Sequence, residues 1–466
     1  MTFPFKNTFA QLPESFFEKT TPTPVTNPTL IALNEQLAID LGINLPDLKT
    51  PQGLAYLSGN QIPPGSDPLA MVYAGHQFGG FNPQLGDGRA ILLGEADGRD
   101  IQLKGAGRTP YSRRGDGRSA LGPVLREYLV SEAMHHLGIP TTRALAAVTT
   151  GENVQRETPE PGGIFTRVAS SHLRIGTVQF FAAHRDLEGL AQLVYYTNQR
   201  HYPNSTTALT LLENVIEKQA HLIAHWMRVG FIHGVMNTDN MSLSGETIDY
   251  GPCAFMDHFN PAQKYSYIDQ QSRYAYQNQP GIAQWNLTRL AEALLPLISD
   301  NEEESVRLAK AALEKFPHIY KAAHLHHFSQ KIGLPDNKSP ELIQELLDHL
   351  AHQQVDFTLA FRHLGESQTR FLDHFKDPAP LQKWLTQWQS QGTPDQDLMS
   401  QVNPAYIPRN HRVEEVIQAA YQNRDFTPFH KLHQILQNPY QSQPQNAAYQ
   451  SPPTSDQIIP ATYCGT

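Results

Sequence analysis

The sequence predicts an α+β protein with two lobes, and three observations support this prediction. Short β-like runs separated by glycines fill residues 66–200, together with one clear helical segment. Helical periodicity then dominates residues 205–380. Early in this second part, His233 and Asn240 stand seven residues apart and are followed by Asp249 in a D-Y-G triplet, which is the spacing of the H-R-D-x-x-x-x-N and D-F-G motifs of protein kinases. We therefore expect a protein-kinase-like bilobal fold with an N-terminal extension and a helical C-terminal lobe.

Composition restricts the class of protein. With 39% apolar and 17% charged residues, the chain of 466 residues has the composition of a globular protein. Its formal charge of -9 argues against nucleic-acid or membrane-surface binding, because such binders usually carry a basic excess. No stretch approaches the ~18 apolar residues of a membrane span, and the N-terminus matches neither a signal peptide nor a transit peptide. We expect a cytoplasmic protein and, by default, a monomer.

Four segments are expected along the chain. Residues 1–65 are rich in Pro, Thr and Asn around one helical pattern, LIALNEQLAIDLGI, and should wrap the core as an extension. Residues 66–200 are predicted to form a nucleotide-binding lobe, and residues 201–380 a helical lobe that contains the catalytic loop. Residues 381–466 form a C-terminal extension. Its polar end has too little apolar surface to offset the entropy of ordering, so a mobile tail carrying Cys464 is predicted.

The elements of both lobes follow from local patterns. RAILLGE, DIQLKG and IFTRVA are predicted strands. GPVLREYLVSEAMHHLG is a predicted helix, with Pro123 in its first turn and Gly138 at its C-terminal cap. ALTLLENVIEKQAHLIAHWMRVGF is a second, longer helix that runs directly into His233. A long helix leading into the catalytic loop agrees with the kinase-like order.

A lysine and a glutamate are placed as a kinase-like lobe would place them. Lys104 ends the strand DIQLKG, and Glu127 lies 23 residues later on the first helix. In such lobes the strand lysine holds nucleotide phosphates and the helix glutamate positions the lysine through an ion pair. Val124 and Met134 share the helix face of Glu127, so its carboxylate should point into the protein. Chance also places such pairs in many α/β proteins.

A basic loop suggests a phosphate site. The stretch RTPYSRRGDGRS, residues 108–119, contains four arginines, two glycines and Asp116. In an acidic protein this concentration favours a phosphate cradle of backbone N–H groups and guanidinium groups, and the alternative is a solvated loop. Arg167 and Arg174, in FTRVASSHLRIG, are two further candidate anion binders.

Upstream, QLGDGRAILLGE places Gly86, Gly88 and Arg89 directly before a strand. Backbone without a Cβ can approach a ligand closely there. A plain hairpin turn explains the same glycines equally well.

The stretch HGVMNTDNMSLSGETIDYG lacks the usual catalytic base of a kinase, because Val235 stands where the aspartate is expected. Asn240 and Asp249 supply the two oxygen ligands that a kinase-like site uses for magnesium. Asp239 is the only carboxylate in HGVMNTDN and can replace the missing base. The metal-free alternative is that Asp239 caps a turn and Asp249 ends a strand.

Nearly the whole chain resembles the selenoprotein O family, the SelO or YdiU-type protein adenylyltransferases. The similarity extends over NTFAQLPESFF, YAGHQFGGFNPQLGDGRAILLGE, QLKGAGRTPYSRRGDGRSALGPVLREYLVSEAMHHLGIPTTRAL and HGVMNTDNMSLSGETIDYGP. The resemblance implies a kinase-like fold in which ATP binds flipped, with its α-phosphate toward the acceptor. It implies transfer of AMP to Ser, Thr or Tyr hydroxyls of proteins, release of pyrophosphate, and dependence on Mg²⁺ or Mn²⁺.

The same resemblance assigns roles to residues of this chain. Asp239 resembles the proton acceptor of the family, and Asn240 and Asp249 resemble its metal ligands. The nucleotide contacts that it implies are Gly86, Gly88, Arg89, Lys104, Asp116, Gly117, Arg167, Arg174 and Asp249, with Glu127 as the partner of the lysine. A reversed triphosphate needs a cationic pocket, which the basic loop and Arg174 can provide.

Two cysteines complete the expectations. Cys464 stands third from the end, where animal members of the family carry selenocysteine. The resemblance also implies a regulatory disulfide between the C-terminal cysteine and one after the D-x-G motif, although Cys253 lies only four residues beyond Asp249. Two alternatives to AMP transfer are an ordinary ATP phosphotransferase and a non-catalytic nucleotide sensor or redox adaptor acting through Cys464.

Overall fold

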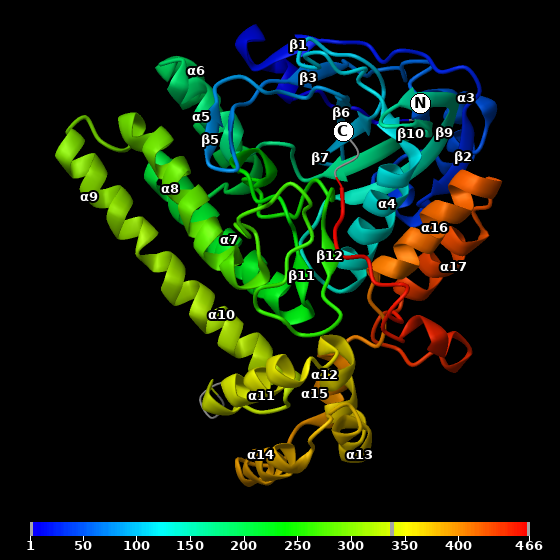
Figure 1. Cartoon of the computed structure of the whole chain (residues 1–466). Helices are drawn as coiled ribbons and strands as arrows, with labels where there is room; N and C mark the ends of the chain where they lie inside the picture. Colours follow the sequence, from blue (N-terminus) through cyan, green and yellow to red (C-terminus); the bar gives the residue numbers. More distant parts are fainter. Residues whose placement is uncertain (1–2, 336–339, 464–466) are drawn as a thin grey trace.

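The structure is a computed structural model that describes residues 3–335 and 340–463 of the chain. It is a mixed α and β protein with an antiparallel sheet and a helical C-terminal region, as the α+β prediction required. Figure 1 shows the sheet and α4 (Leu121–His136) in one part of the molecule. The long helices α7 (Ala208–Val229), α8 (Gln279–Ile298) and α10 (Lys315–Lys331) lie in the other part.

The main sheet has the strand order β1-β3-β6-β7-β10-β9-β2, with β8 paired to β10, and every pairing in it is antiparallel. The N-terminal segment therefore supplies both edge strands, β1 and β2. The strands of the chain are β1 (Phe17–Lys19), β2 (Thr29–Leu33), β3 (Leu69–Met71), β4 (Gly75–Gln77), β5 (Gly80–Asn82), β6 (Ala90–Ala96), β7 (Arg99–Lys104), β8 (Ser119–Ala120), β9 (Arg143–Gln155), β10 (Pro159–Ala169), β11 (Phe231–Ile232) and β12 (Ala254–Phe255).

The predicted strands RAILLGE, DIQLKG and IFTRVA correspond to β6, β7 and β10, and the first predicted helix corresponds to α4. The prediction of one helical pattern over LIALNEQLAIDLGI is wrong in its first half. Residues 29–33 form β2 because they pair with β9. Asn34 then starts α1 (Glu35–Asp40), since its side chain accepts a hydrogen bond from the backbone N–H of Leu37. Pairing with a distant strand has overridden the local helical pattern.

Helices build the rest of the molecule. Helix α7 packs against α8, α9 and α10, and Gly230, with φ +71°, ends it before β11 and His233. The remaining helices are α2 (Leu45–Leu48), α3 (Pro51–Leu57), α5 (Ile175–Ala183), α6 (Leu187–His201), α9 (Glu302–Leu313), α11 (Pro340–Gln353), α12 (Phe357–Glu366), α13 (Gln368–Leu372), α14 (Ala379–Ser390), α15 (Gln396–Val402), α16 (Asn410–Asn423) and α17 (Thr427–Leu436).

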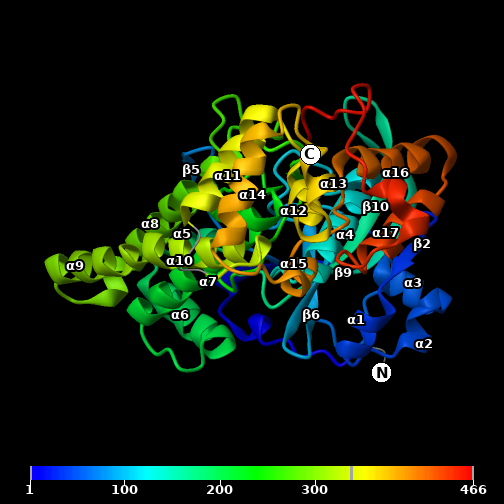
Figure 2. The same ribbon diagram turned by 90° about the horizontal axis from the view of Figure 1, so that it is seen from below.

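The C-terminal segment returns to the sheet. Figures 1 and 2 show α16 and α17 beside α4, and the three helices share one hydrophobic cluster that includes Leu129, Val416 and Phe429. This packing ties the end of the chain to the helix that carries Glu127.

The described part of the tail contacts the rest of the protein, and the mobility of the tail stays a prediction. The Nε atom of Arg409 donates to the carbonyl of Gln450 at 2.9 Å. Thr462 donates through its hydroxyl to the carbonyl of Pro252 at 2.7 Å, and its backbone N–H donates to Tyr265 at 2.8 Å. Hydrogen bonds to backbone groups thus position a segment that has few apolar side chains to bury. Cys464 lies outside the described residues.

In the described residues, no helix is long and apolar enough to cross a membrane.

Candidate active site

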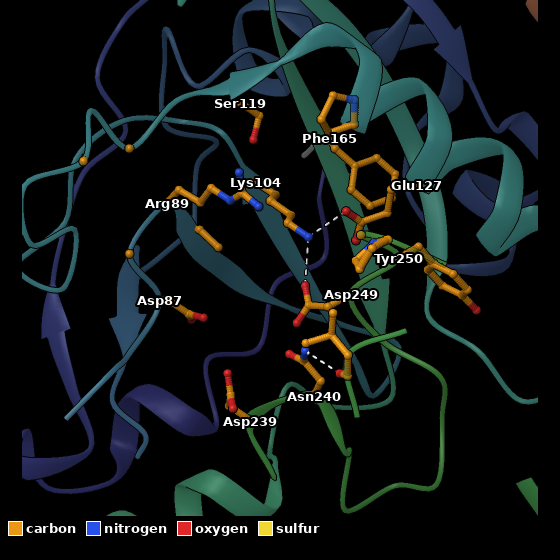
Figure 3. A pocket seen from close by; sticks show the side chains of 18 of the residues that line it. Asp87, Arg89, Lys104, Ser119, Glu127, Phe165, Asp239, Asn240, Asp249 and Tyr250 are labelled. Atoms are coloured by element: carbon orange, nitrogen blue, oxygen red, sulfur yellow. Dashed lines mark hydrogen bonds and ion pairs between the residues drawn. The ribbon is translucent and has the colours of Figure 1, made fainter. Parts of the chain in front are cut away.

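A cavity of about 800 Å³ opens between the sheet, α4, the basic loop and the loop after β11. Figure 3 shows it from close by. The predicted site residues that line it are Gly88, Arg89, Lys104, Asp116, Gly117, Glu127, Arg167, Arg174, Asp239, Asn240 and Asp249. Gly86 is not among the lining residues. One cavity thus brings together side chains that lie up to about 160 positions apart in the sequence.

Lys104 is at the centre of the ion pairs that face the cavity. Its Nζ lies 2.6 Å from Glu127 Oε2 on α4 and 2.8 Å from Asp249 Oδ1, and both contacts are drawn in Figure 3. Only 12% of the Lys104 side chain and 6% of the Glu127 side chain are exposed. The ion pair that the spacing of Lys104 and Glu127 suggested is therefore present, and the alternative of an unrelated lysine and glutamate does not hold.

Asp249 is surrounded by three cations. Lys104 is one, and the second is Arg167, whose Nη1 lies 2.6 Å from Asp249 Oδ1. The third is Arg174, whose Nη2 lies 3.5 Å from Oδ2. Burial alone would raise the pKa of this carboxyl, but Arg167, Lys104 and Arg174 hold its pKa well below the ordinary value. Asp249 is thus ionised at neutral pH, and it occupies a left-handed backbone conformation with φ +62°.

His233 fixes the backbone just before Asp249. Its ring lies 2.8 Å from the carbonyl of Ile248, to which Nε2 donates, and it stacks on Trp226 of α7 with ring centroids 5.4 Å apart. Its backbone N–H donates to the side chain of Gln279 at the start of α8. The histidine of the motif is therefore a structural link between the two loops of the site and the helical region.

Arg167, predicted as a nucleotide contact, is committed to protein partners. It is 1% exposed. Besides Asp249, Nη1 contacts Glu127 at 3.3 Å, and Nη2 donates to Gln102 at 2.6 Å. The remaining Nε donates to His172 at 3.2 Å. The guanidinium group thus supports the two acidic residues from beneath the cavity.

Two other predicted arginines keep donors that the protein does not fill. Arg174 is 3% exposed and lies over the ring of Tyr73 at 4.5 Å, but its buried Nε has no hydrogen-bond partner in the part of the chain that the structure describes. Its contact with Asp87 is long, at 3.8 Å. Arg89 lines the cavity, and no hydrogen bond or ion pair of its side chain to a described residue is seen. Unfilled guanidinium donors beside a cavity are suited to an anionic ligand.

The basic loop is held in place by its own arginines. Arg118 donates to the carbonyls of Thr23 and Pro24, each at 3.0 Å, and Arg108 donates to the carbonyl of Gly115 at 2.8 Å. These two arginines are therefore used to fix the loop. Arg114 and Arg118 both line the cavity, and Arg114 is the one of the two that is not used in these loop contacts.

Asp116 and Gly117 shape the tip of this loop. Asp116 forms an ion pair with Arg156 at 2.9 Å, beyond the end of β9. Gly117 has φ +68°, and a Cβ on it would lie 2.2 Å from the backbone of Gly107. A side chain at this position would push the loop away from the strand that ends at Lys104.

Gly86 and Gly88 differ in their surroundings. Gly86 has φ +87°, and a Cβ on it would lie 2.3 Å from the ring of Tyr111. Gly88 accepts a hydrogen bond from Ser112 through its carbonyl and lines the cavity. Neither glycine lies in a hairpin turn, because β5 before them pairs with β4 and β6 after them pairs with β3 and β7.

Asp239 and Asn240 lie in a short 3-10 helix, Thr238–Asn240. Asp239 is 6% exposed; its Oδ2 accepts a hydrogen bond from Gln77 at 3.0 Å, and its buried Oδ1 has no partner among the described residues. Burial raises the pKa of Asp239 to about 6. A carboxylate with a raised pKa and an unoccupied lone pair is a candidate proton acceptor.

The donor set of Asn240 and Asp249 fits a hard cation such as Mg²⁺. Asn240 donates through Nδ2 to the carbonyl of Val235 at 2.9 Å, which leaves its Oδ1 as the coordinating atom. Across residues 3–335 and 340–463, no group of three or more His, Cys, Asp or Glu side chains is placed to hold a metal. A cation between Asn240 and Asp249 would therefore complete its coordination with phosphate oxygens and water.

Sequence reasoning missed three residues of the cavity. Asp87 is 2% exposed, accepts a hydrogen bond from Gln102 at 3.0 Å, and has a pKa that burial raises. The position of Asp87 between two glycines in QLGDGR could have indicated that it belongs to the site. Tyr73 and Gln77 gave no such signal, because only the fold places them beside Arg174 and Asp239.

Comparison with known proteins identifies the family of the chain. A family model described as protein adenylyltransferase SelO matches residues 1–437. A protein of Bradyrhizobium diazoefficiens is 53% identical over 487 aligned positions, which cover 100% of this chain and 99% of that protein. One from Rhizobium leguminosarum bv. trifolii is 54% identical over 488 positions, covering 100% and 97%. One from Methylorubrum extorquens is 53% identical over 495 positions, covering 100% and 99%. All three are described as protein nucleotidyltransferase YdiU.

These findings define the class of protein: the chain is a nucleotidyltransferase. Within that class, it belongs to the SelO family of protein adenylyltransferases.

Proposed function

We propose that this enzyme transfers AMP from ATP to Ser, Thr or Tyr hydroxyls of proteins and releases pyrophosphate. The observation that carries the proposal is the arrangement of one cavity. Lys104, Glu127 and Asp249 form an ion-pair cluster, and Asp239 lies across the cavity from Lys104 in Figure 3. We further propose that the two structural parts are the lobes of a kinase-like fold, with this cavity between them.

The cations of the cavity support the binding of a triphosphate. Lys104 can exchange part of its contact with Asp249 for a phosphate oxygen, as strand lysines do in kinase-like sites. Arg89 and Arg174 offer the unfilled donors described above, and Arg114 adds a fourth cation from the basic loop. Because these cations lie on several sides of the cavity, they can bind the β- and γ-phosphates of an ATP molecule whose α-phosphate faces the acceptor.

The acceptor chemistry is assigned to Asp239. Its carboxylate takes the proton of the acceptor hydroxyl, the oxygen forms a bond to the α-phosphorus of ATP, and the bond from that phosphorus to the α,β-bridging oxygen breaks. The leaving group is pyrophosphate, which carries away the electron pair. Since burial raises the pKa of Asp239 to about 6, the carboxylate is mostly unprotonated at neutral pH and is a stronger base than an ordinary aspartate.

Asn240 and Asp249 are the residues that would hold Mg²⁺ or Mn²⁺. When bound, such a cation supplies positive charge next to the phosphates. Asp249 is suited to this role, because the neighbouring cations keep it ionised.

An ordinary phosphotransferase is the second candidate, because the spacing of His233, Asn240 and Asp249 is also that of protein kinases. Intact mass spectrometry of a protein acceptor incubated with enzyme, ATP and Mg²⁺ separates the two. We expect the acceptor to gain the mass of an adenylyl group, and Asp249→Ala to abolish the gain. A gain of a phosphoryl group would favour the second candidate. Transfer that persists in Asp249→Ala would contradict the proposed metal site, and binding of ATP without any transfer would favour the nucleotide sensor.

A further inference from the structure

The hairpin formed by β4 and β5 lies directly on the loop that carries Asp239. The backbone N–H of His76 donates to the Thr238 hydroxyl at 2.7 Å. The backbone N–H of Phe78 donates to the side chain of Asn237 at 3.1 Å. Two consecutive residues of the loop are thus fixed by the hairpin, on the N-terminal side of Asp239.

The hairpin approaches Asp239 so closely that only glycine fits beside it. A Cβ on Gly75 would lie 2.6 Å from Asp239 Oδ1. On the other side, a Cβ on Gly176 of α5 would lie 2.1 Å from the carbonyl of Ala74, whose N–H donates to Gly176 at 2.9 Å. The hairpin is therefore held between α5 and the carboxylate, with no room to shift.

A second contact makes the hairpin rigid. The Nε2 atom of Gln179 on α5 donates a hydrogen bond to Nδ1 of His76 at 2.9 Å. Its ring packs against Phe81 and Trp285, with ring centroids 4.7 and 5.3 Å apart. A short two-stranded hairpin would be unstable by itself, so these contacts explain how it keeps a fixed position.

Gln77 is the one side chain of this hairpin that reaches the carboxylate. Its Nε2 lies 3.0 Å from Asp239 Oδ2. An amide N–H donates to a carboxylate without taking its proton, and it occupies only one lone pair of Oδ2. Oδ1 is buried beside Gly75 and has no partner among the described residues, so the hydrogen bond from Gln77 is the one that fixes the orientation of the carboxylate.

We propose that Gln77 is a positioning residue for the base, and that the hairpin exists in this place to orient the Asp239 carboxylate toward the acceptor hydroxyl. The inference rests on the proposed function, because it assigns Gln77 a part in that reaction. Gln77 acts through Asp239. It should therefore affect the rate of transfer and leave ATP binding unchanged.

The test measures AMP transfer to a protein acceptor, with kcat and the KM for ATP determined for full-length variants. Gln77→Met keeps the length of the side chain and removes the donor, and Gln77→Glu keeps its shape and replaces the donor with an acceptor. Gln84→Met is the matched control, since Gln84 is an exposed glutamine just beyond the same hairpin. A general base contributes about 10²–10⁴-fold to a rate, so loss of its orientation should lower kcat by roughly tenfold or more.

We expect both Gln77 variants to lose kcat with an unchanged KM for ATP and an unchanged Tm, and Gln84→Met to match the wild type. In an Asp239→Asn background, Gln77→Met should cause no further loss, because the two residues act as one unit. If Gln77→Met had the kcat of the wild type, the inference would be overturned. It would also be overturned if the double variant lost kcat by the product of the two single losses. Either result would leave the proposed function intact. Absence of AMP transfer by the wild-type enzyme would instead overturn the proposed function, and the inference with it.

Discussion

Arg167→Met should destabilise the protein strongly, although Arg167 is not expected to touch the acceptor. The substitution keeps an unbranched side chain in place and removes a buried guanidinium group. In the native structure that group contacts Asp249, Glu127, Gln102 and His172. Lys104 remains beside both carboxylates and Arg174 remains 3.5 Å from Asp249, but the arginine that contacts both Asp249 and Glu127 is lost.

The size of the expected loss of stability follows from the burial of Arg167 and its acidic partners. Removing one partner of a buried ion pair typically costs about 3–5 kcal/mol. A chain of 466 residues that unfolds as one unit has an unfolding entropy of about 1 kcal/mol/K. The Tm should therefore fall by about 3–5 °C. Activity should fall as well, since Asp249 loses the arginine that lies 2.6 Å from its Oδ1.

Differential scanning calorimetry of purified variants measures this shift. Arg307→Met is the matched control, because Arg307 pairs with Glu304 on the exposed face of α9 and should change the Tm little. If Arg167→Met lowered the Tm no more than Arg307→Met does, the reasoning about the buried cluster would be refuted.

Three further predictions follow from the structure. Gly117→Ala should weaken ATP binding in isothermal titration calorimetry, because its Cβ would lie 2.2 Å from the backbone of Gly107; unchanged affinity would show that the loop tip has room to move. Asp249→Ala should lower the affinity for Mg²⁺-ATP in the same assay, and an unchanged affinity would argue against its role as a metal ligand. Burial lowers the pKa of His225 to about 3 and that of His327 to about 2. Below pH 6.5 the unfolded chain protonates these imidazoles while the folded chain does not, so the Tm should fall from pH 7 to pH 5. A His225→Gln/His327→Gln variant should show a shallower fall, and a slope equal to that of the wild type would contradict the assignment.

The parts of the site that sequence could predict are those with a fixed spacing. Lys104 and Glu127 were expected to pair because a strand and a helix of recognisable pattern bring them to one cavity, and their ion pair is present. Asp239 and Asn240 were singled out by their place in a motif. The ion pair is predictable because local patterns determine both the element and the residue at its end, whereas the roles of Asp239 and Asn240 stay predictions.

Other features depend on segments that meet only in the folded chain. Residues 29–33 form a strand because β9 lies beside them, which no local pattern records. Gln77 contacts Asp239 across 162 positions, and the guanidinium group of Arg167 donates to Gln102 and His172. These contacts join residues that are far apart in the sequence. No rule of residue spacing in a single sequence predicts such contacts.

Of the two cysteines in the disulfide that the family resemblance implies, one lies in the described residues. Cys253 is fully buried, two residues beyond Gly251, whereas Cys464 lies outside the described residues. Thr462 reaches the same region, since its hydroxyl donates to the carbonyl of Pro252, the neighbour of Cys253. A link between Cys253 and Cys464 therefore remains a prediction. Peptide mapping of the oxidised protein under non-reducing conditions would detect it.

The central claim is that the α-phosphate of ATP, and not the γ-phosphate, is transferred. The most direct measurement incubates the enzyme and a protein acceptor with ATP labelled at the α-phosphorus in one reaction and at the γ-phosphorus in another. The account predicts label on the protein only from α-labelled ATP, with the γ-label released as pyrophosphate. Label on the protein only from γ-labelled ATP, with ADP as the product, would contradict it.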